Sequence, residues 1–202
     1  MKLKRLLATA LVLSFLSPGV LAESVNLSLS SDLAGQDDIY TVEIVLFQQA
    51  SPSVNQEVWP DDFMPLDYSD ETRLRQHDGM PMSLNETLAR TDFALNGEAS
   101  RLSRNGYSVL YHNSWVQKFS PNSKTKLVLT DPNLSLEGTL NIERQRFLHV
   151  YPDIRLDLRS ILGQNAPVVR MQESRRMRSS ELHYIDHPVL GMLVLFRPVS
   201  GT

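Results

Sequence analysis

The sequence predicts an α+β fold, a mainly antiparallel β-sheet with helical packing from residues ~84–105. Two observations predict the sheet. Apolar residues occupy most of the even positions of residues 134–158, the period of a strand with one buried face. Two further apolar runs flank Asp186-His187-Pro188 and can pair as a hairpin. A third observation predicts the helix: Ser83 and Glu86 have the spacing of a capping box.

The first 22 residues have the features of a secretory signal peptide. Lys2, Lys4 and Arg5 precede an apolar run, Leu6–Leu16, that is too short to span a bilayer. Small or branched residues lead up to Ala22, after which we expect cleavage. We therefore expect a soluble periplasmic protein, not a membrane-spanning one.

The rest of the chain is predicted to form a flexible arm, residues 23–38, and a single domain, residues 39–199. The arm is rich in Ser, Asp, Gly and Asn, with scattered apolar residues. The formal net charge is −3, and loss of the signal peptide makes it more negative by three. An acidic chain does not favour nucleic-acid binding. The chain has no cysteine, so its domain depends on a hydrophobic core for stability.

The first half of the domain alternates strand and helix signals. Tyr40–Phe47 is almost continuously apolar, which is typical of a strand covered on both faces, with Glu43 as the exception. Residues 48–82 contain four prolines and are predicted to be a long loop. We expect helix from Ser83 through Arg90, and a second helical piece over residues 98–105 that ends at Gly106.

The second half reads as strands. Residues 107–117 and 126–129 are β-rich, and the run over residues 134–158 is too long for one strand, so it must turn around residues 143–146. The last element is predicted to be a hairpin, with residues 175–185 pairing with residues 189–196.

Several phrases of the sequence, in this order and spacing, resemble the CsiV family of periplasmic peptidoglycan-binding proteins of Gram-negative bacteria. They are Y40-T-V-E-I-V-L-F47, E57-V-W-P60, G106-Y-S-V-L-Y-H-N-S-W-V-Q117, R146-F-L-H149 and E181-L-H-Y-I-D-H-P-V-L-G191. The resemblance covers about Tyr40 to Phe196. It implies a non-enzymatic protein that binds peptidoglycan and supports cell-wall assembly. The alternatives are an interaction module of the cell-envelope machinery with little direct glycan affinity, whose partner would be a cell-wall synthase or its activator, and an envelope hydrolase. The resemblance supplies no list of ligand-contacting residues and implies no cofactor.

The best candidates for glycan contact are aromatic. Phe147, His149 and Tyr151 occupy the odd, otherwise polar face of their predicted strand, and Trp115 and Trp59 are further candidates. An aromatic ring can pack against the C–H face of a sugar, while polar neighbours bond the hydroxyls. The alternative is that the row belongs to the core, covered by a helix from residues 84–105.

Arginines gather near residues 170–178 of this acidic chain. A guanidinium binds carboxylates in a bidentate manner, and peptidoglycan stem peptides carry carboxylates. Alternation places Arg176 and Arg178 on one face and Arg175 on the other. Arg176 and Arg178 are therefore candidate ligand-binding residues, although intramolecular ion pairs explain the run about as well.

Residues 181–191 contain two of the five histidines and invite a metal or acid–base site. His183, Asp186 and His187 are spaced as metal ligands on one helix face, but Pro188 favours a strand and a turn, where they diverge. We expect Asp186 to bond backbone amides of the turn and His183 to pair across strands. No hydrolase motif is present, and Glu43 and Glu181 are only weak candidates for a carboxylate pair.

Overall fold

The computed structural model describes residues 23–201 except 53, 55–58, 60–64, 78, 80, 132 and 134. The predicted signal peptide lies outside the described residues, as do Leu134 and most of the phrase E57-V-W-P60, of which Trp59 is described. In the part of the chain that is described, no helix has the length and apolar character needed to cross a membrane.

The larger of two sheets has seven strands in the order β1-β12-β2-β5-β4-β3, with β11 also paired to β12. Its strands are β1 (Val25–Leu27), β2 (Ile39–Gln48), β3 (Arg75–Gln76), β4 (Glu86–Thr87), β5 (Ser108–Lys118), β11 (Leu182–Asp186) and β12 (Leu190–Gly201). β2, β5, β11 and β12 pair antiparallel. β2 is central, and nine of its ten residues are buried, because side chains pack on both faces of the sheet.

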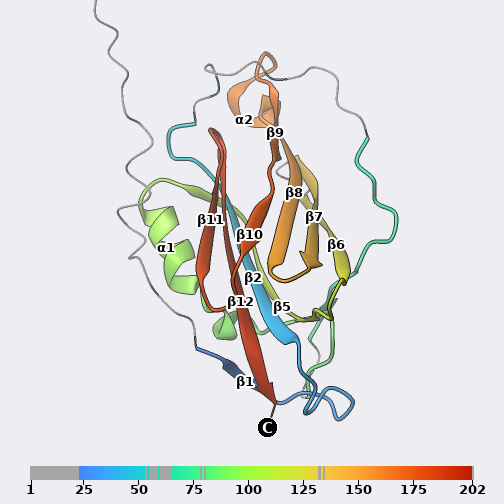
Figure 1. Cartoon of the computed structure of the whole chain (residues 1–202). Coiled ribbons are helices and arrows are strands. Elements are labelled where there is room, and N and C mark those ends of the chain that lie inside the picture. The colour runs from blue at the N-terminus through green and yellow to red at the C-terminus, as the bar shows by residue number, and fades with distance from the viewer. Residues whose placement is uncertain are drawn as a thin grey trace, which may run out of the picture.

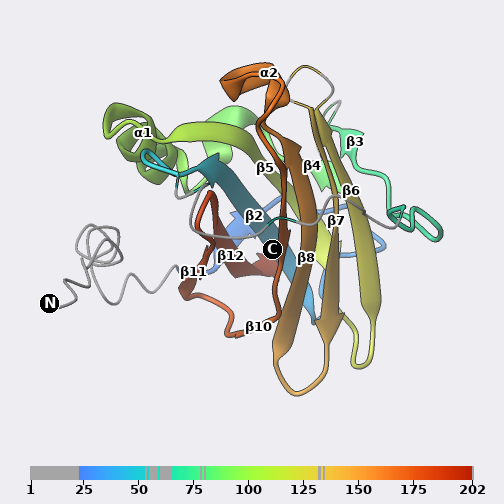
Figure 2. The same cartoon turned by 90° about the horizontal axis from the view of Figure 1, so that it is seen from above.

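The smaller sheet has five antiparallel strands in the order β10-β8-β7-β6, with β9 also paired to β8. Its strands are β6 (Lys124–Asp131), β7 (Leu136–Arg144), β8 (Leu148–Asp157), β9 (Val168–Gln172) and β10 (Arg175–Met177). The four-residue helix α2 (Arg159–Leu162) lies between β8 and β9. Successive strands β6, β7 and β8 form a meander, visible in Figure 2.

The two sheets share one hydrophobic core. Even-numbered residues of β2, such as Ile44, belong to the same buried cluster as even-numbered residues of β7 and β8, such as Leu140 and Ile154. Figures 1 and 2 show the five-stranded sheet lying across one face of the larger sheet. The alternation along β7 and β8 is thereby explained: most of their even-numbered side chains enter this core.

The other face of the seven-stranded sheet is covered by helix α1 (Asn96–Arg104) and by the segments before it. The apolar residues Leu95, Ala99 and Leu102 pack against Val45 and Phe47 of β2. The larger sheet is therefore covered on both sides, whereas α1 lies far from the five-stranded sheet (Figure 1).

The end of α1 follows the sequence signal closely. Gly106 has φ +86° and its N–H bonds Ser103 O, while Tyr107 N–H bonds Leu102 O. These two bonds form a Schellman motif, which requires the left-handed conformation that glycine adopts without steric cost.

The α+β prediction with helical packing over residues 84–105 is wrong. Among the described residues, strands make up 51% and helices 9%. Only half of the predicted capping box forms: the Glu86 carboxylate accepts a hydrogen bond from Ser83 N at 2.9 Å, but Asn85 has φ +61°. A left-handed residue cannot continue a right-handed helix, so the chain turns into β4. A single 3₁₀ turn, η2 (Arg90–Asp92), follows before α1.

The predicted strands are present, with two refinements. The run over residues 134–158 turns between Arg144 and Leu148, where β7 ends and β8 begins. The run over residues 175–185 is two strands: β10 joins the smaller sheet and β11 the larger, and Ser180, with φ +64°, lies between them. Residues 23–38 include β1, which pairs with β12, and two buried leucines, Leu29 and Leu33.

Candidate ligand-binding face

The five-stranded sheet turns one side away from the core, and we call this side the outer face. Strand register arranges its side chains as a grid, because residues directly opposite on neighbouring strands point to the same side. One row of the grid contains Lys124, Glu143, His149 and Arg176, the next Lys126, Asn141 and Tyr151, and the third Val128, Thr139, Asp153 and Gln172. The outer face thus combines aromatic, amide and charged side chains.

The predicted aromatic row lies at one end of the outer face. Phe147, His149 and Tyr151 are all partly exposed, and the rings of His149 and Tyr151 are stacked, with centroids 6.3 Å apart and planes 15° from parallel. The guanidinium of Arg176 lies 4.7 Å from the ring centroid of Phe147, and that of Arg146 lies 5.6 Å from it. Since α1 packs on the larger sheet, the alternative that a helix over residues 84–105 covers this row is wrong.

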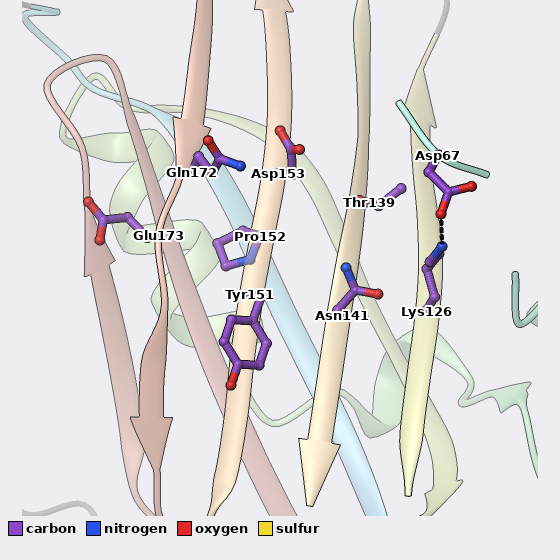
Figure 3. A pocket seen from close by; sticks show the side chains of 9 residues that line it. All are labelled: Asp67, Lys126, Thr139, Asn141, Tyr151, Pro152, Asp153, Gln172 and Glu173. Atoms are coloured by element: carbon purple, nitrogen blue, oxygen red, sulfur yellow. Dashed lines mark hydrogen bonds and ion pairs between the residues drawn. The ribbon is translucent and has the colours of Figure 1, made fainter. Parts of the chain in front are cut away.

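A shallow hollow of about 270 Å³ adjoins the aromatic row (Figure 3). Its lining comes from β6, β7, β8, β9, the loop between β9 and β10, and the loop before β3. It consists of Asp67, Lys126, Thr139, Asn141, Tyr151, Pro152, Asp153, Gln172 and Glu173. The hollow lies on the outer face beside the stretch of β8 where pairing with β9 has ended and pairing with β10 has not yet begun.

Pro152 explains why the hollow is there. Its carbonyl accepts a hydrogen bond from Glu173 N at 3.4 Å, so the backbone of Pro152 faces the edge of β8 that pairs with β9 and β10. In antiparallel strands the N and O of one residue point to the same edge, and proline has no N–H to donate. The ladder is interrupted at this residue, where β9 has ended at Gln172 and β10 begins at Arg175.

Most charges of the outer face are already paired. Lys126 Nζ lies 2.6 Å from Asp67 Oδ2, and Arg170 binds both carboxylate oxygens of Asp153, at 2.7 and 2.6 Å. The bond from Lys126 holds the pKa of Asp67 well below its usual range, and the bond to Asp153 raises the pKa of Arg170. Asp67 and Arg170 are therefore charged and engaged in ion pairs at neutral pH.

The structure brings four of the six predicted ligand-binding residues together: Phe147, His149, Tyr151 and Arg176. Trp115 is elsewhere, on β5, fully buried in the core between the sheets, so its ring offers no surface to a ligand. Arg178 lies just beyond β10, exposed, with its guanidinium 3.5 Å from Glu181 Oε1.

The residues of E181-L-H-Y-I-D-H-P188 have separate structural partners. His183 Nε2 lies 3.0 Å from both the N and the O of Arg178, and Asp186 Oδ1 accepts from the Tyr184 hydroxyl at 2.5 Å. His187 Nδ1 accepts from the backbone N–H groups of Val189 and Leu190, at 3.3 and 3.2 Å.

It is therefore His187, and not Asp186 as predicted, that bonds the backbone amides of this turn. Because its Nδ1 is an acceptor, its Nε2 carries the proton and donates to Arg170 O at 3.2 Å. Nowhere in the described residues do three His, Asp or Glu side chains gather as metal ligands.

Glu43 has a structural role in its surroundings. Its buried carboxylate accepts bonds from the N–H groups of Ala94 and Leu95, at 2.7 and 2.8 Å, and lies 2.8 Å from His112 Nε2. Glu43 thus ties the start of α1 to the centre of the larger sheet, and Glu181 is on the loop before β11, paired with Arg178. The two acids do not form a carboxylate pair.

Of the residues that line the hollow, the sequence predictions identified Tyr151 and missed the others. Asn141 and Gln172 are outward-facing polar residues of predicted strands, which carries no signal by itself. Pro152 could have been noticed, since a proline inside a strand pattern marks a break in pairing. Asp67 comes from a loop whose position the sequence does not give.

Comparison with known proteins gives one match. A family model described as "Peptidoglycan-binding protein, CsiV" matches residues 7–199. No curated protein and no solved structure gives a significant match.

Proposed function

The chain belongs to the CsiV family, described as peptidoglycan-binding, and from that premise we propose that it is a non-catalytic periplasmic protein that binds peptidoglycan and supports cell-wall assembly. The periplasmic location rests on the predicted signal peptide and on the location of peptidoglycan itself. The non-catalytic role rests on the family description and on Glu43 and Glu181, whose carboxylates have structural partners in separate places.

The observation that carries the binding proposal is the open aromatic row. Phe147, His149 and Tyr151 are partly exposed side by side, on a sheet face that no helix of the described residues covers. Aromatic side chains in a folded protein are usually buried, so an exposed row flanked by polar groups indicates a binding surface. Arg176, directly opposite His149 on β10, adds a cation suited to the carboxylates of muropeptides.

Sedimentation with purified sacculi tests the proposal. We expect the purified protein to sediment with sacculi, and the double variant His149→Ala/Tyr151→Ala to lose at least tenfold in affinity, about 1.4 kcal/mol. Both positions are partly exposed, so thermal unfolding should change little. Arg104→Ala, on the exposed surface of α1, is a control remote from the outer face.

Three outcomes would contradict the proposal. Failure to sediment above a control protein of equal charge would exclude peptidoglycan binding. Release of soluble muropeptides by the protein alone would show that it is an enzyme. Recovery of a wall synthase or its activator from glycan-depleted extract, without sedimentation on sacculi, would identify an interaction module instead.

A further inference from the structure

We propose that the hollow beside Tyr151 binds the acetamido group of an N-acetylated sugar, so that this part of the outer face recognises the glycan strand and not the stem peptide. This inference rests on the proposed function and names the part of peptidoglycan that the same face takes. Both sugars of peptidoglycan carry an acetamido group, which has one hydrogen-bond donor and one acceptor.

Two free side-chain amides carry the inference. Asn141 lies opposite Tyr151 in the β7–β8 pairing, and Gln172 lies opposite Asp153 in the β8–β9 pairing, so the two amides are on opposite sides of β8 (Figure 3). Within the described ranges, neither side-chain amide has a hydrogen-bond partner. An amide side chain offers both a donor and an acceptor, so one amide can accept from the acetamido N–H while the other donates to the acetamido C=O.

The surroundings select a neutral polar ligand. Asp67 and Asp153, which would otherwise attract a cation, are bonded to Lys126 and to Arg170. Among the charged residues of the lining, Glu173 alone has no ion pair with a described residue, and it is exposed at the rim. A single exposed carboxylate can accept a bond from a sugar hydroxyl without requiring a charged ligand.

The shape fits one sugar ring. Tyr151 supplies an aromatic wall continuous with the stacked ring of His149, and Pro152 and Thr139 supply a buried floor. The volume of about 270 Å³ is near the lower end of ligand pockets, roughly 300–1,000 Å³. A sugar seated here would continue along the outer face over His149 towards Phe147.

Calorimetric titration with soluble oligosaccharides tests the inference. The probes are a hexamer of N-acetylglucosamine and a glucose hexamer, which has the same linkage type but no acetamido groups. We expect the acetylated hexamer to bind at least tenfold more tightly. Asn141→Ala/Gln172→Ala should remove that preference, and Gln76→Ala, an exposed glutamine on β3 of the other sheet, should not.

A parallel arm adds a competitor to the sedimentation on intact sacculi: glycan strands freed enzymatically of their stem peptides, which are soluble because the peptides cross-link the wall. Release of the bound protein by these strands supports the inference. Absence of release, together with equal affinity for the two hexamers, overturns the inference and leaves peptidoglycan binding intact. Absence of sedimentation on intact sacculi contradicts the proposed function, while the hexamers still decide whether the hollow recognises acetamido groups.

Discussion

Two regions of this chain carry histidine, acid and aromatic side chains close together, and they differ in what their polar atoms do. In the hairpin of β11 and β12, the side chains of His183, Asp186 and His187 bond the chain's own backbone or a neighbouring hydroxyl. On the outer face, His149 stacks on Tyr151, and the amides of Asn141 and Gln172 have no partner among the described residues. The denser cluster in sequence is the structural one.

This difference gives a criterion for choosing a candidate site. A polar side chain whose donors and acceptors are engaged within the fold contributes to stability, because breaking its bonds leaves buried groups unpaired. A side chain with free donors and acceptors can exchange water for a ligand. Substitutions in the hairpin should therefore reduce stability, and substitutions on the outer face should reduce binding.

The largest effect is expected from Gly191→Ala in the hairpin. A Cβ at this position would lie 2.5 and 2.6 Å from ring carbons of Phe47 and 3.1 Å from Tyr184. Phe47 is fully buried, and its ring stacks on that of Tyr184 at 6.2 Å, so neither can move away cheaply. Overpacking of this kind costs about 3 kcal/mol or more in the free energy of unfolding, measurable by denaturant titration.

Gly97→Ala is the matched control. Nothing lies within 4 Å of a Cβ at Gly97, which is in the first turn of α1. Alanine is the better helix former by about 0.5–1 kcal/mol, so this variant should be as stable as the wild type or more so. Equal destabilisation by the two glycine substitutions would contradict the packing argument.

The next effect compares two histidines. His187→Ala removes the acceptor for two backbone N–H groups, one of them on the fully buried Leu190, and should cost about 2 kcal/mol of stability. His149→Ala, on the open row, should cost less than about 0.5 kcal/mol. The binding of the folded protein to sacculi should show the opposite: His149→Ala should weaken it more than His187→Ala does.

The comparison is sharpest if each substitution changes one quantity only: His187→Ala the free energy of unfolding, and His149→Ala the binding to sacculi. If His187→Ala weakened sacculus binding while unfolding remained unchanged, the hairpin would be a functional site after all. Urea titration followed by sedimentation of each folded variant measures both quantities.

The alternation of apolar and polar residues was enough to predict which side chains face away from the core, since side chains of a strand point to opposite faces with a period of two. It placed Phe147, His149 and Tyr151 on one face of a single strand. In the structure His149 and Tyr151 are on one face of β8, and Phe147 lies in the turn immediately before it. The alternation could not show that the face is open, because that depends on where α1 packs. Nor could it place Arg176 beside His149, which follows from the pairing of β10 with β8.

The wrong predictions come from local signals that two conformations share. Ser83 and Glu86 form one bond of a capping box in a turn as readily as in a helix, and the left-handed φ of Asn85 decides between them. Asp186 and His187 are adjacent and both can bond turn amides. Only the three-dimensional course of the chain, which brings Tyr184 and Gln49 to Asp186, leaves that role to His187.

Tyr184→Phe tests the hairpin through pH. Burial, and then the bond to Asp186, raise the pKa of the Tyr184 phenol above its ordinary value of 10.0. The folded state favours the protonated phenol, so its contribution is complete below about pH 10 and decreases as the pH rises above it. At pH 7 we expect Tyr184→Phe to lose about 1 kcal/mol, the net value of one hydrogen bond.

Above pH 10 the stability of the wild type should fall more steeply than that of Tyr184→Phe, because the variant has no phenol to ionise. Unfolding free energies between pH 7 and 11 give both slopes. Identical slopes would mean that this hydroxyl is not held by the hairpin.

The smallest effect is expected from Arg176→Ala on the outer face. Its guanidinium packs over Phe147 at 4.7 Å and has no ion pair with a described residue, so its loss should leave stability within about 0.5 kcal/mol. Affinity for sacculi should fall about threefold, roughly 0.7 kcal/mol, and the difference should shrink at high salt as the charge is screened. Arg176→Lys keeps the charge but not the planar stacking group, and should recover only the salt-dependent part. Arg104→Ala removes the same charge from the far side of the molecule. If it weakened sedimentation as much as Arg176→Ala, net charge would account for the effect, and Arg176 would give no evidence that the outer face binds peptidoglycan.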